Sequence, residues 1–114
     1  MSDIVERPWG TFESLRLEDN FQVKVLTIFP KMKISLQKHF KRSEHWVVVQ
    51  GKAKVIVDDQ IKKLSRNQAV FIPKESIHRI INESSETLKL VEVQVGEYFG
   101  EDDIERIEDM FDRV

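Results

Sequence analysis

A group of possible metal ligands between residues 37 and 44 is the most informative feature of the sequence. Gln37 and His39 are two residues apart, and Glu44 follows five residues later. In a β-strand, side chains two apart share a face, so the Gln37 amide oxygen and the His39 imidazole can converge on one point. A short turn around Lys41 and Arg42 would reverse the chain. We therefore expect Glu44 to meet this pair across a hairpin.

His78, from a later predicted strand, completes the set. Two imidazole nitrogens, one amide oxygen and one carboxylate suit Zn²⁺ best, and Mn²⁺, Co²⁺, Ni²⁺ or Fe²⁺ would be tolerated. The chain contains no cysteine, which excludes thiolate ligands and disulfides. The alternative interpretation is that the four residues only line a polar barrel mouth.

The elements that must position these ligands are predicted to be β-strands. A chain of 114 residues has the size of a single domain, and we take residues 1–114 as one. Apolar residues alternate or cluster in short β-branched runs, which favours an all-β sandwich or barrel. The predicted strands are 9–16, 21–29, 33–40, 44–50, 53–58, 61–64, 69–72, 77–82 and 86–95. The acidic segment 101–113 has apolar residues at helical spacing and predicts a short amphipathic C-terminal helix.

Composition limits the classes of partner. The formal net charge of -2 gives no electrostatic reason to expect nucleic acid or an anionic membrane. The first residues lack the pattern of a signal peptide, and no apolar run approaches the ~20 residues needed to cross a bilayer, so we expect a cytoplasmic protein. His45, Val47 and Val49 form an apolar alternation opposite Glu44, which predicts that a second copy covers this face in a homodimer.

Two spaced patterns resemble the two motifs of the cupins. The first motif, Gly-x5-His-x-His-x3,4-Glu-x6-Gly, is similar to the pattern Lys31-x5-Gln37-x-His39-x4-Glu44-x6-Gly51. The second motif, Gly-x5-Pro-x-Gly-x2-His-x3-Asn, is similar to the pattern Asn67-x5-Pro73-x-Glu75-x2-His78-x3-Asn82. Three motif glycines are therefore replaced, and for Lys31 we expect a different type of turn to absorb the change.

The resemblance narrows to the type II mannose-6-phosphate isomerase domain. It rests on residues 7–10, 35–39, 42–48, 72–73, 78–79, 92–94 and 98–104, and Phe111-Asp112 departs from it by replacing a terminal Tyr-Gly. The resemblance implies a jelly-roll barrel, that is, a cupin double-stranded β-helix, with Gln37, His39, Glu44 and His78 as metal ligands. In that family the domain commonly forms the carboxyl-terminal part of a bifunctional enzyme that includes a mannose-1-phosphate guanylyltransferase.

The implied reaction interconverts mannose 6-phosphate and fructose 6-phosphate through an enediol, which requires a general base. Glu92 is our candidate, because apolar surroundings on its predicted strand would raise its pKa, and Gln94 shares its face as a substrate-binding candidate. Lys33 shares the alternation of Gln37 and His39, so we expect it to contact substrate or to replace Glu92 as the base.

Three cations are candidates for binding the phosphate or stabilising the enediolate. These are Arg42, Arg79 and Lys24, each of which would otherwise be a solvated surface charge. Two rival functions stay open. One is a non-catalytic metal-bearing cupin that binds a sugar or acts beside a separate guanylyltransferase, and the other is another cupin enzyme, such as a metal-dependent dioxygenase.

Overall fold

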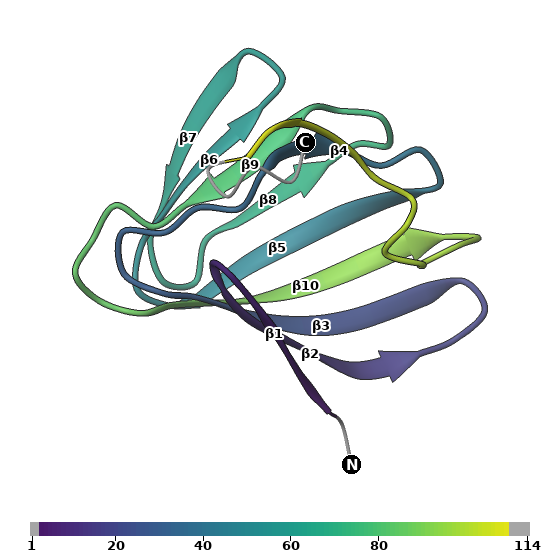
Figure 1. The fold of residues 1–114 in the computed structure, drawn as a ribbon, viewed down its shortest axis with the longest axis horizontal. Helices are drawn as coiled ribbons and strands as arrows, with labels where there is room; N and C mark the ends of the chain where they lie inside the picture. The colour runs from purple at the N-terminus through teal and green to yellow at the C-terminus, as the bar shows by residue number, and fades with distance from the viewer. Residues whose placement is uncertain (1–2, 110–114) are drawn as a thin grey trace.

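The computed structural model describes residues 3–109, which form two facing antiparallel β-sheets (Figure 1). The six-stranded sheet has the order β1-β2-β3-β10-β5-β8 and the five-stranded sheet the order β11-β4-β9-β6-β7. The strands are β1 Ile4–Arg7, β2 Gly10–Leu17, β3 Phe21–Ile28, β4 Leu36–Lys38, β5 Arg42–Gln50, β6 Ala53–Val57, β7 Gln60–Leu64, β8 Ala69–Ile72, β9 His78–Ile81, β10 Leu88–Gly96 and β11 Glu105–Glu108. The all-β prediction is confirmed.

The inner faces of the two sheets are polar at one end of the strands and apolar at the other. In β3 every second residue is buried, beginning with Gln22 and Lys24 and ending with Leu26 and Ile28. The apolar end packs into one core, because burying each large aliphatic side chain stabilises the fold by about 1.5–3 kcal/mol. Core residues include Trp9, Phe12, Ile28, Val48, Val55, Ile80, Leu88 and Leu90. The other end of the interior is polar and contains the site.

The predicted hairpin between the ligand-bearing strands is wrong. β4 pairs with β9 and β11 in one sheet, whereas β5 pairs with β10 and β8 in the other. The chain therefore crosses between sheets at residues 39–41, and β4 is shorter than the predicted strand 33–40. Residues 37 and 44 face each other through the interior of the sandwich. The sequence also did not predict β1, since the first predicted strand begins at residue 9.

The predicted C-terminal helix is also wrong, since residues 3–109 contain no helix. Residues 105–108 form β11, which adds to the edge of β4, and the C-terminal segment runs there from β10 (Figure 1, yellow). A single short helix is only marginally stable in water. Pairing with an open sheet edge satisfies the backbone N–H and C=O groups of this segment instead. The last part of the predicted helix, residues 110–113, lies outside the described residues. Nothing helical within the described range could span a membrane.

The three positions at which another residue replaces a cupin motif glycine all adopt a positive φ, a conformation that favours glycine. Lys31 has φ 64°, Asn67 has φ 77° and Glu75 has φ 67°. Lys31 itself therefore adopts the left-handed conformation, and the expectation of a different turn type stays a prediction. Its backbone amide donates to Ser84 O at 3.2 Å, which fixes this turn.

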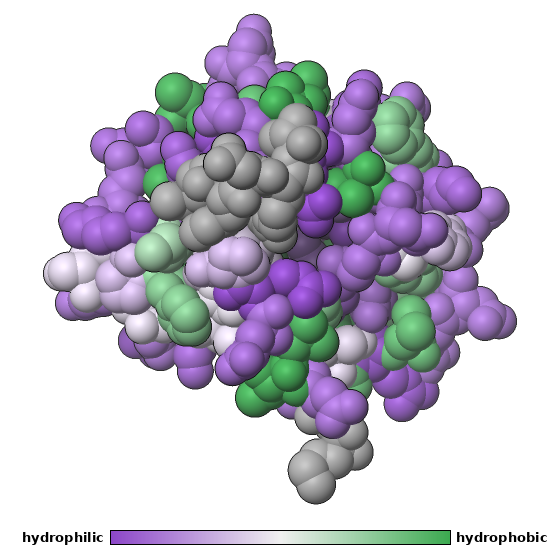
Figure 2. Space-filling view, viewed as in Figure 1, coloured by the Kyte–Doolittle hydropathy of each residue, from purple (hydrophilic) through white to green (hydrophobic). Residues whose placement is uncertain are grey.

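Polar side chains cover most of the visible surface, and hydrophobic residues form separate patches on it (Figure 2). The outward face of the six-stranded sheet carries His45, Val47 and Val49, as expected. The His45 ring packs on Phe71 with a centroid distance of 4.7 Å, and the Phe71 residue is 48% exposed. The homodimer that would cover this face stays a prediction.

Candidate metal centre

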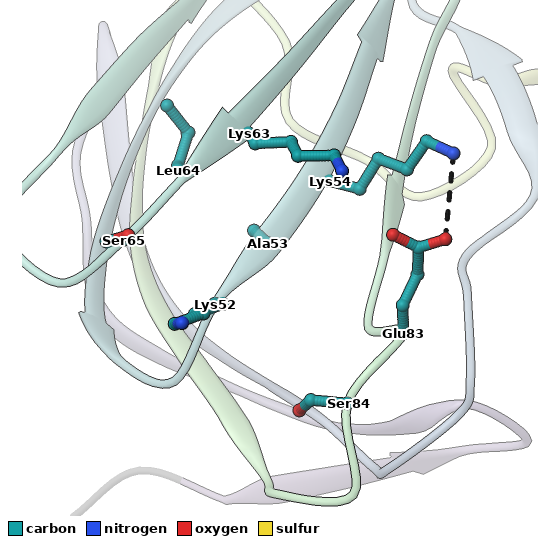
Figure 3. A pocket seen from close by; sticks show the side chains of 8 residues that line it. All are labelled: Lys52, Ala53, Lys54, Lys63, Leu64, Ser65, Glu83 and Ser84. Atoms are coloured by element: carbon teal, nitrogen blue, oxygen red, sulfur yellow. Dashed lines mark ion pairs between the residues drawn. The ribbon is translucent and has the colours of Figure 1, made fainter.

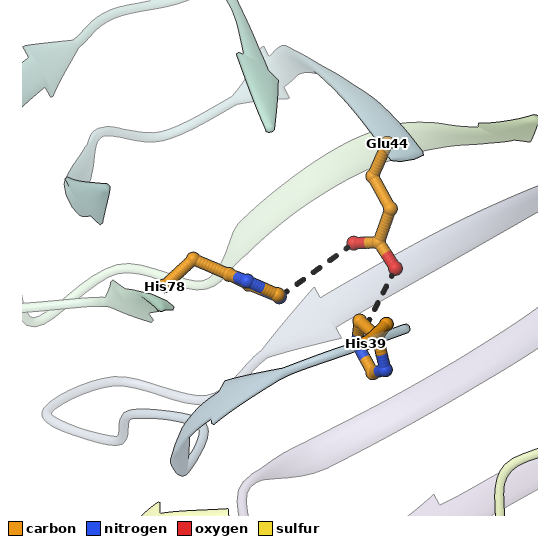
Figure 4. Close-up of side chains that lie close together, drawn as sticks. All are labelled: His39, Glu44 and His78. Atoms are coloured by element: carbon orange, nitrogen blue, oxygen red, sulfur yellow. Dashed lines mark ion pairs between the residues drawn. The ribbon is translucent and has the colours of Figure 1, made fainter. Parts of the chain in front are cut away.

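His39, Glu44 and His78 converge from three segments at the polar end of the interior (Figure 4). His39 directly follows β4, Glu44 lies on β5 of the opposite sheet, and His78 begins β9. His39 Nε2 lies 3.5 Å from Glu44 Oε2, and His78 Nε2 lies 4.0 Å from Glu44 Oε1. Two donors bound at ~2.1 Å to one tetrahedral ion lie roughly 3.4 Å apart, so small side-chain movements would bring all three donors onto one ion.

Both histidines are held in the tautomer that allows metal binding through Nε2. His39 Nδ1 donates to Asp103 O at 2.6 Å, and His78 Nδ1 donates to Ser76 O at 2.9 Å. A carbonyl oxygen only accepts, so the proton of each neutral ring is on Nδ1 and the lone pair is on Nε2. Each lone pair therefore faces Glu44.

Electrostatics keep these rings neutral. Burial, together with the neighbouring Arg42 guanidinium, lowers the pKa of His39 to about 4. Burial also lowers the pKa of His78. Since a protonated imidazole cannot bind a metal, the low pKa values favour ligation near neutral pH.

Gln37, the fourth predicted ligand, lines the same cavity and is next to His78 in the β4–β9 pairing. Its amide nitrogen donates to Ser35 O at 3.4 Å, which leaves the amide oxygen as the donor for an ion. The cavity has a volume of about 60 Å³, enough for an ion and a small number of water molecules. Coordination by Gln37 stays a prediction.

Glu92, the candidate base, lies on β10 in the wall of this cavity and is only 5% exposed. Trp46 Nε1 donates to Glu92 Oε2 at 2.8 Å and to Glu44 Oε1 at 3.1 Å. Burial and the hydrogen-bonded Glu44 carboxylate raise the pKa of Glu92 to about 8. Glu92 can therefore hold or release a proton near neutral pH.

A row of buried amides connects Glu92 on β10 to Ser14 on β2. Gln94 Nε2 donates to Glu92 Oε1 at 2.7 Å, and Gln22 Nε2 donates to Gln94 Oε1 at 2.8 Å. Ser14 Oγ completes the row by donating to Gln22 Oε1 at 2.8 Å. Gln94 shares the inward face of Glu92, as the sequence predicted, and its closest polar partners are protein groups.

Two of the predicted cations line the cavity. Arg42 Nε donates to Glu44 Oε2 at 2.9 Å, and one of its terminal nitrogens lies 3.3 Å from His39 Nε2. Lys24 Nζ lies 2.9 Å from Glu101 Oε2 and 4.2 Å from the centre of the Phe12 ring. Both side chains are 5% exposed, so the expectation of solvated surface charges does not hold for them.

Arg79 and Lys33 do not line this cavity. Arg79 follows the inward-facing His78 and so points to the other face of the sheet, where it donates to Ile34 O at 2.9 Å and to Glu108 Oε1 at 2.8 Å. The sequence placed Lys33 and Gln37 on the same face of one strand. This regular alternation is interrupted, because the consecutive residues Ile34 and Ser35 are both buried. The structure therefore does not bring either residue to the cavity that holds the other candidates.

Two acidic residues next to the site, Asp103 behind His39 and Glu101 in the cavity wall, were not identified from the sequence. Asp103 accepts hydrogen bonds from the amides of Phe40 and Lys41 with its carboxylate, at 3.1 Å and 2.9 Å, and orients His39 with its carbonyl. Glu101 reaches the cavity wall from the same loop. Both belong to the motif 98–104, but interpretation of the segment as a helix obscured them.

A larger pocket of about 450 Å³ lies at the opposite end of the five-stranded sheet (Figure 3). Lys52, Lys54 and Lys63 line it, and Lys54 Nζ pairs with Glu83 Oε2 at 3.6 Å. Its lining contains neither a group of metal donors nor a buried acid. We therefore assign the chemistry to the smaller cavity.

Residues 1–109 match the family model described as mannose-6-phosphate isomerase C-terminal. The chain belongs to this family. Over 110 residues it is 48% identical to the alginate biosynthesis protein AlgA of Pseudomonas aeruginosa, and 44% identical to a mannose-1-phosphate guanylyltransferase of Escherichia coli. Each match covers 96% of the chain and 23% of the relative, so this mannose-6-phosphate isomerase C-terminal domain spans about a quarter of either protein.

Solved structures share the cupin fold at lower identity. Oxalate decarboxylase from Bacillus subtilis matches 93% of the chain with a TM-score of 0.83 and 16% identity, over 30% of its own chain. The capsular polysaccharide assembling protein CapF from Staphylococcus aureus matches 95% of the chain with a TM-score of 0.78 and 24% identity, over 34% of its own chain. These matches support the fold alone.

Proposed function

We propose that this domain is a metal-dependent isomerase that interconverts mannose 6-phosphate and fructose 6-phosphate. The observation that supports it best is the buried His39, Glu44 and His78 group beside the Glu92 carboxyl, in a chain of the mannose-6-phosphate isomerase C-terminal family. Aldose–ketose isomerisation requires a base beside the first two sugar carbons and positive charge near their oxygens. The cavity contains both kinds of group.

The donor set fits a divalent ion held by His39, Glu44 and His78, with Gln37 as the fourth ligand. Such an ion, when bound, would polarise the two adjacent sugar oxygens. The reaction has no net redox change, so Zn²⁺ is the ion that we propose first. Arg42 now contacts the same Glu44 and His39 atoms, and ligation of these atoms would release its guanidinium towards the substrate.

Glu92 is the proposed base. It would take a proton from one sugar carbon and return it to the neighbouring carbon, so that the carboxyl group is unchanged after each turnover. Gln94 and Trp46 each donate to one of its oxygens and fix its orientation. A base with a pKa of about 8 keeps a fraction of the group ionised at neutral pH while remaining strong enough to accept the proton.

The cations have separate proposed roles. Arg42 is the closest to the metal ligands and would stabilise negative charge on the enediolate. Lys24 contacts the half-exposed Glu101 and would bind the sugar phosphate together with the terminal nitrogens of Arg42. Arg79 is not given a role in the reaction, because its guanidinium holds β11.

A coupled assay tests the proposal most directly. The purified domain, loaded with Zn²⁺, is mixed with mannose 6-phosphate, and fructose 6-phosphate formation is followed; treatment with a chelator provides the control. Activity that depends on the ion supports the proposal. Tight metal and sugar-phosphate binding without turnover would instead favour the non-catalytic interpretation, which the relative named as a guanylyltransferase also favours.

Metal analysis addresses the dioxygenase interpretation. Two histidines and one carboxylate are also the ligand set of non-haem iron oxygenases, so the donor set alone does not distinguish the two classes. A protein that purifies with Fe²⁺ and consumes oxygen would refute the isomerase proposal. One that purifies with Zn²⁺ would support it.

A further inference from the structure

Glu101 differs from the rest of the cavity wall in its exposure. Its side chain is 50% exposed, whereas every other lining residue is at most 9% exposed. Binding sites for small organic ligands usually measure about 300–1,000 Å³. A phosphorylated sugar therefore enters this cavity of about 60 Å³ only if part of the wall moves, and Glu101 is the part with access to solvent.

Glu101 is also the only carboxylate that Lys24 contacts among the described residues. Its Oε2 lies 2.9 Å from Lys24 Nζ and 3.8 Å from Arg42 Nη1, and this Arg42 nitrogen forms no hydrogen bond within residues 3–109. Burial tends to raise the pKa of Glu101, but the two cations outweigh it and the pKa is lowered. Lys24 thus has its carboxylate partner in a side chain that reaches in from the surface, and Arg42, whose Nε binds Glu44, directs a second nitrogen towards the same side chain.

The backbone that carries Glu101 is fixed on both sides. Asp103 binds the Phe40 and Lys41 amides with its carboxylate, and the Tyr98 hydroxyl donates to the Asp102 carboxylate. The carboxylate can therefore leave the cavity by rotation of the Glu101 side chain while the loop stays in place. Exposed side chains change rotamer within nanoseconds, so this movement presents no slow step.

We propose that Glu101 is an exchangeable internal anion that occupies the phosphate subsite formed by Lys24 and Arg42 until the phosphate of a ligand displaces it. A phosphate dianion has more charge and more acceptor oxygens than a carboxylate, so it can bind both cations, including the Arg42 Nη1 that forms no hydrogen bond within residues 3–109. A neutral sugar offers no such replacement and leaves Glu101 in place. The inference rests on the proposed function only in identifying the natural ligand as a phosphorylated sugar.

The test is the binding of inorganic phosphate to Glu101→Gln, measured by calorimetry on the Zn²⁺-loaded domain. Glu97→Gln is the matched control, because it removes the same charge from the same loop and Glu97 has no ion pair within the described residues. We expect Glu101→Gln to bind phosphate at least about tenfold more tightly than wild type, since one charge-assisted contact no longer has to be broken first. Glu97→Gln is expected to stay within about twofold of wild type.

Equal affinities in the two variants, or weaker binding by Glu101→Gln, would overturn the inference. Glu101→Ala provides a second reading if the glutamine variant is poorly folded, and phosphate should raise its unfolding temperature more than that of wild type. The outcome is separable from turnover. A wild-type domain without isomerase activity refutes the proposed function, whereas the phosphate affinities of the variants still decide the role of Glu101.

Discussion

Replacing Glu92 with Gln is expected to make the protein more stable and less active. The amide has the size of the carboxyl group but cannot ionise, so the cost of burying a charge disappears. The hydrogen bonds can be kept by reversing the amide row: the new amide accepts from Trp46 and donates to Gln94, which donates to Gln22, whose amide then donates to Ser14 Oγ. Each buried polar group retains a partner.

The size of the effect follows from the pKa of Glu92, which rises from 4.5 to about 8 on folding. Below pH 4.5 the carboxyl is protonated in both states and has little effect on stability. Between pH 4.5 and 8 the unfolded chain loses the proton while the folded chain retains it, so wild-type stability falls by up to ~1.4 kcal/mol per pH unit. The variant should therefore gain several kcal/mol over wild type by pH 8, with ~5 kcal/mol as an upper bound.

Urea unfolding of both proteins at several pH values, after removal of metal with a chelator, measures this difference. Glu13→Gln is the control, because Glu13 lies on β2 and points to the opposite face of the same sheet. A stability difference between Glu92→Gln and wild type that stays constant from pH 5 to 8 would refute the reasoning. In the isomerase assay, the variant should retain its metal while turnover falls by about 10²–10⁴.

His78→Ala is expected to release the bound ion and abolish isomerisation together, which metal analysis after gel filtration will show; retention of a full equivalent of ion would contradict the donor set. Glu75→Gly should raise stability to urea by roughly 1 kcal/mol because it relieves a left-handed backbone at φ 67°. Its neighbour Lys74, which is not in that conformation, should lose stability when changed to Gly, and a gain there would argue against strain. Val47→Glu should convert the predicted homodimer into a monomer in sedimentation, and a wild-type monomer at micromolar concentration would exclude the dimer.

The convergence of His39, Glu44 and His78 could be predicted from the sequence because strand alternation and motif spacing determine which side chains share a face. His78 faces inward, and the same alternation should have placed Arg79 on the outer face, where it holds β11. The crossover between β4 and β5 could not be predicted in this way. The same spacing between His39 and Glu44 fits a hairpin and a passage between sheets, and only distant pairing with β9 and β10 decides between them.

The prediction of the C-terminal segment was wrong for a related reason. Ile104 and Ile107 have the spacing of an amphipathic helix, but the backbone partner of this segment is β4, more than sixty residues earlier. A local pattern contains no information about an open edge elsewhere in the fold. Glu101 and Asp103 were missed with it, because their partners are also distant: Lys24, Phe40 and Lys41.

The contact between His39 and Asp103 also sets the order in which the site can be built during synthesis. All the proposed donors lie between residues 37 and 78 and leave the ribosome early, but the carbonyl that orients the His39 ring belongs to residue 103. A nascent chain that ends before residue 103 contains the proposed donors but lacks the carbonyl that orients the His39 ring. Removal of residue 103 and those after it should therefore weaken ion binding at His39 while sparing the core, whose residues lie between Trp9 and Leu90.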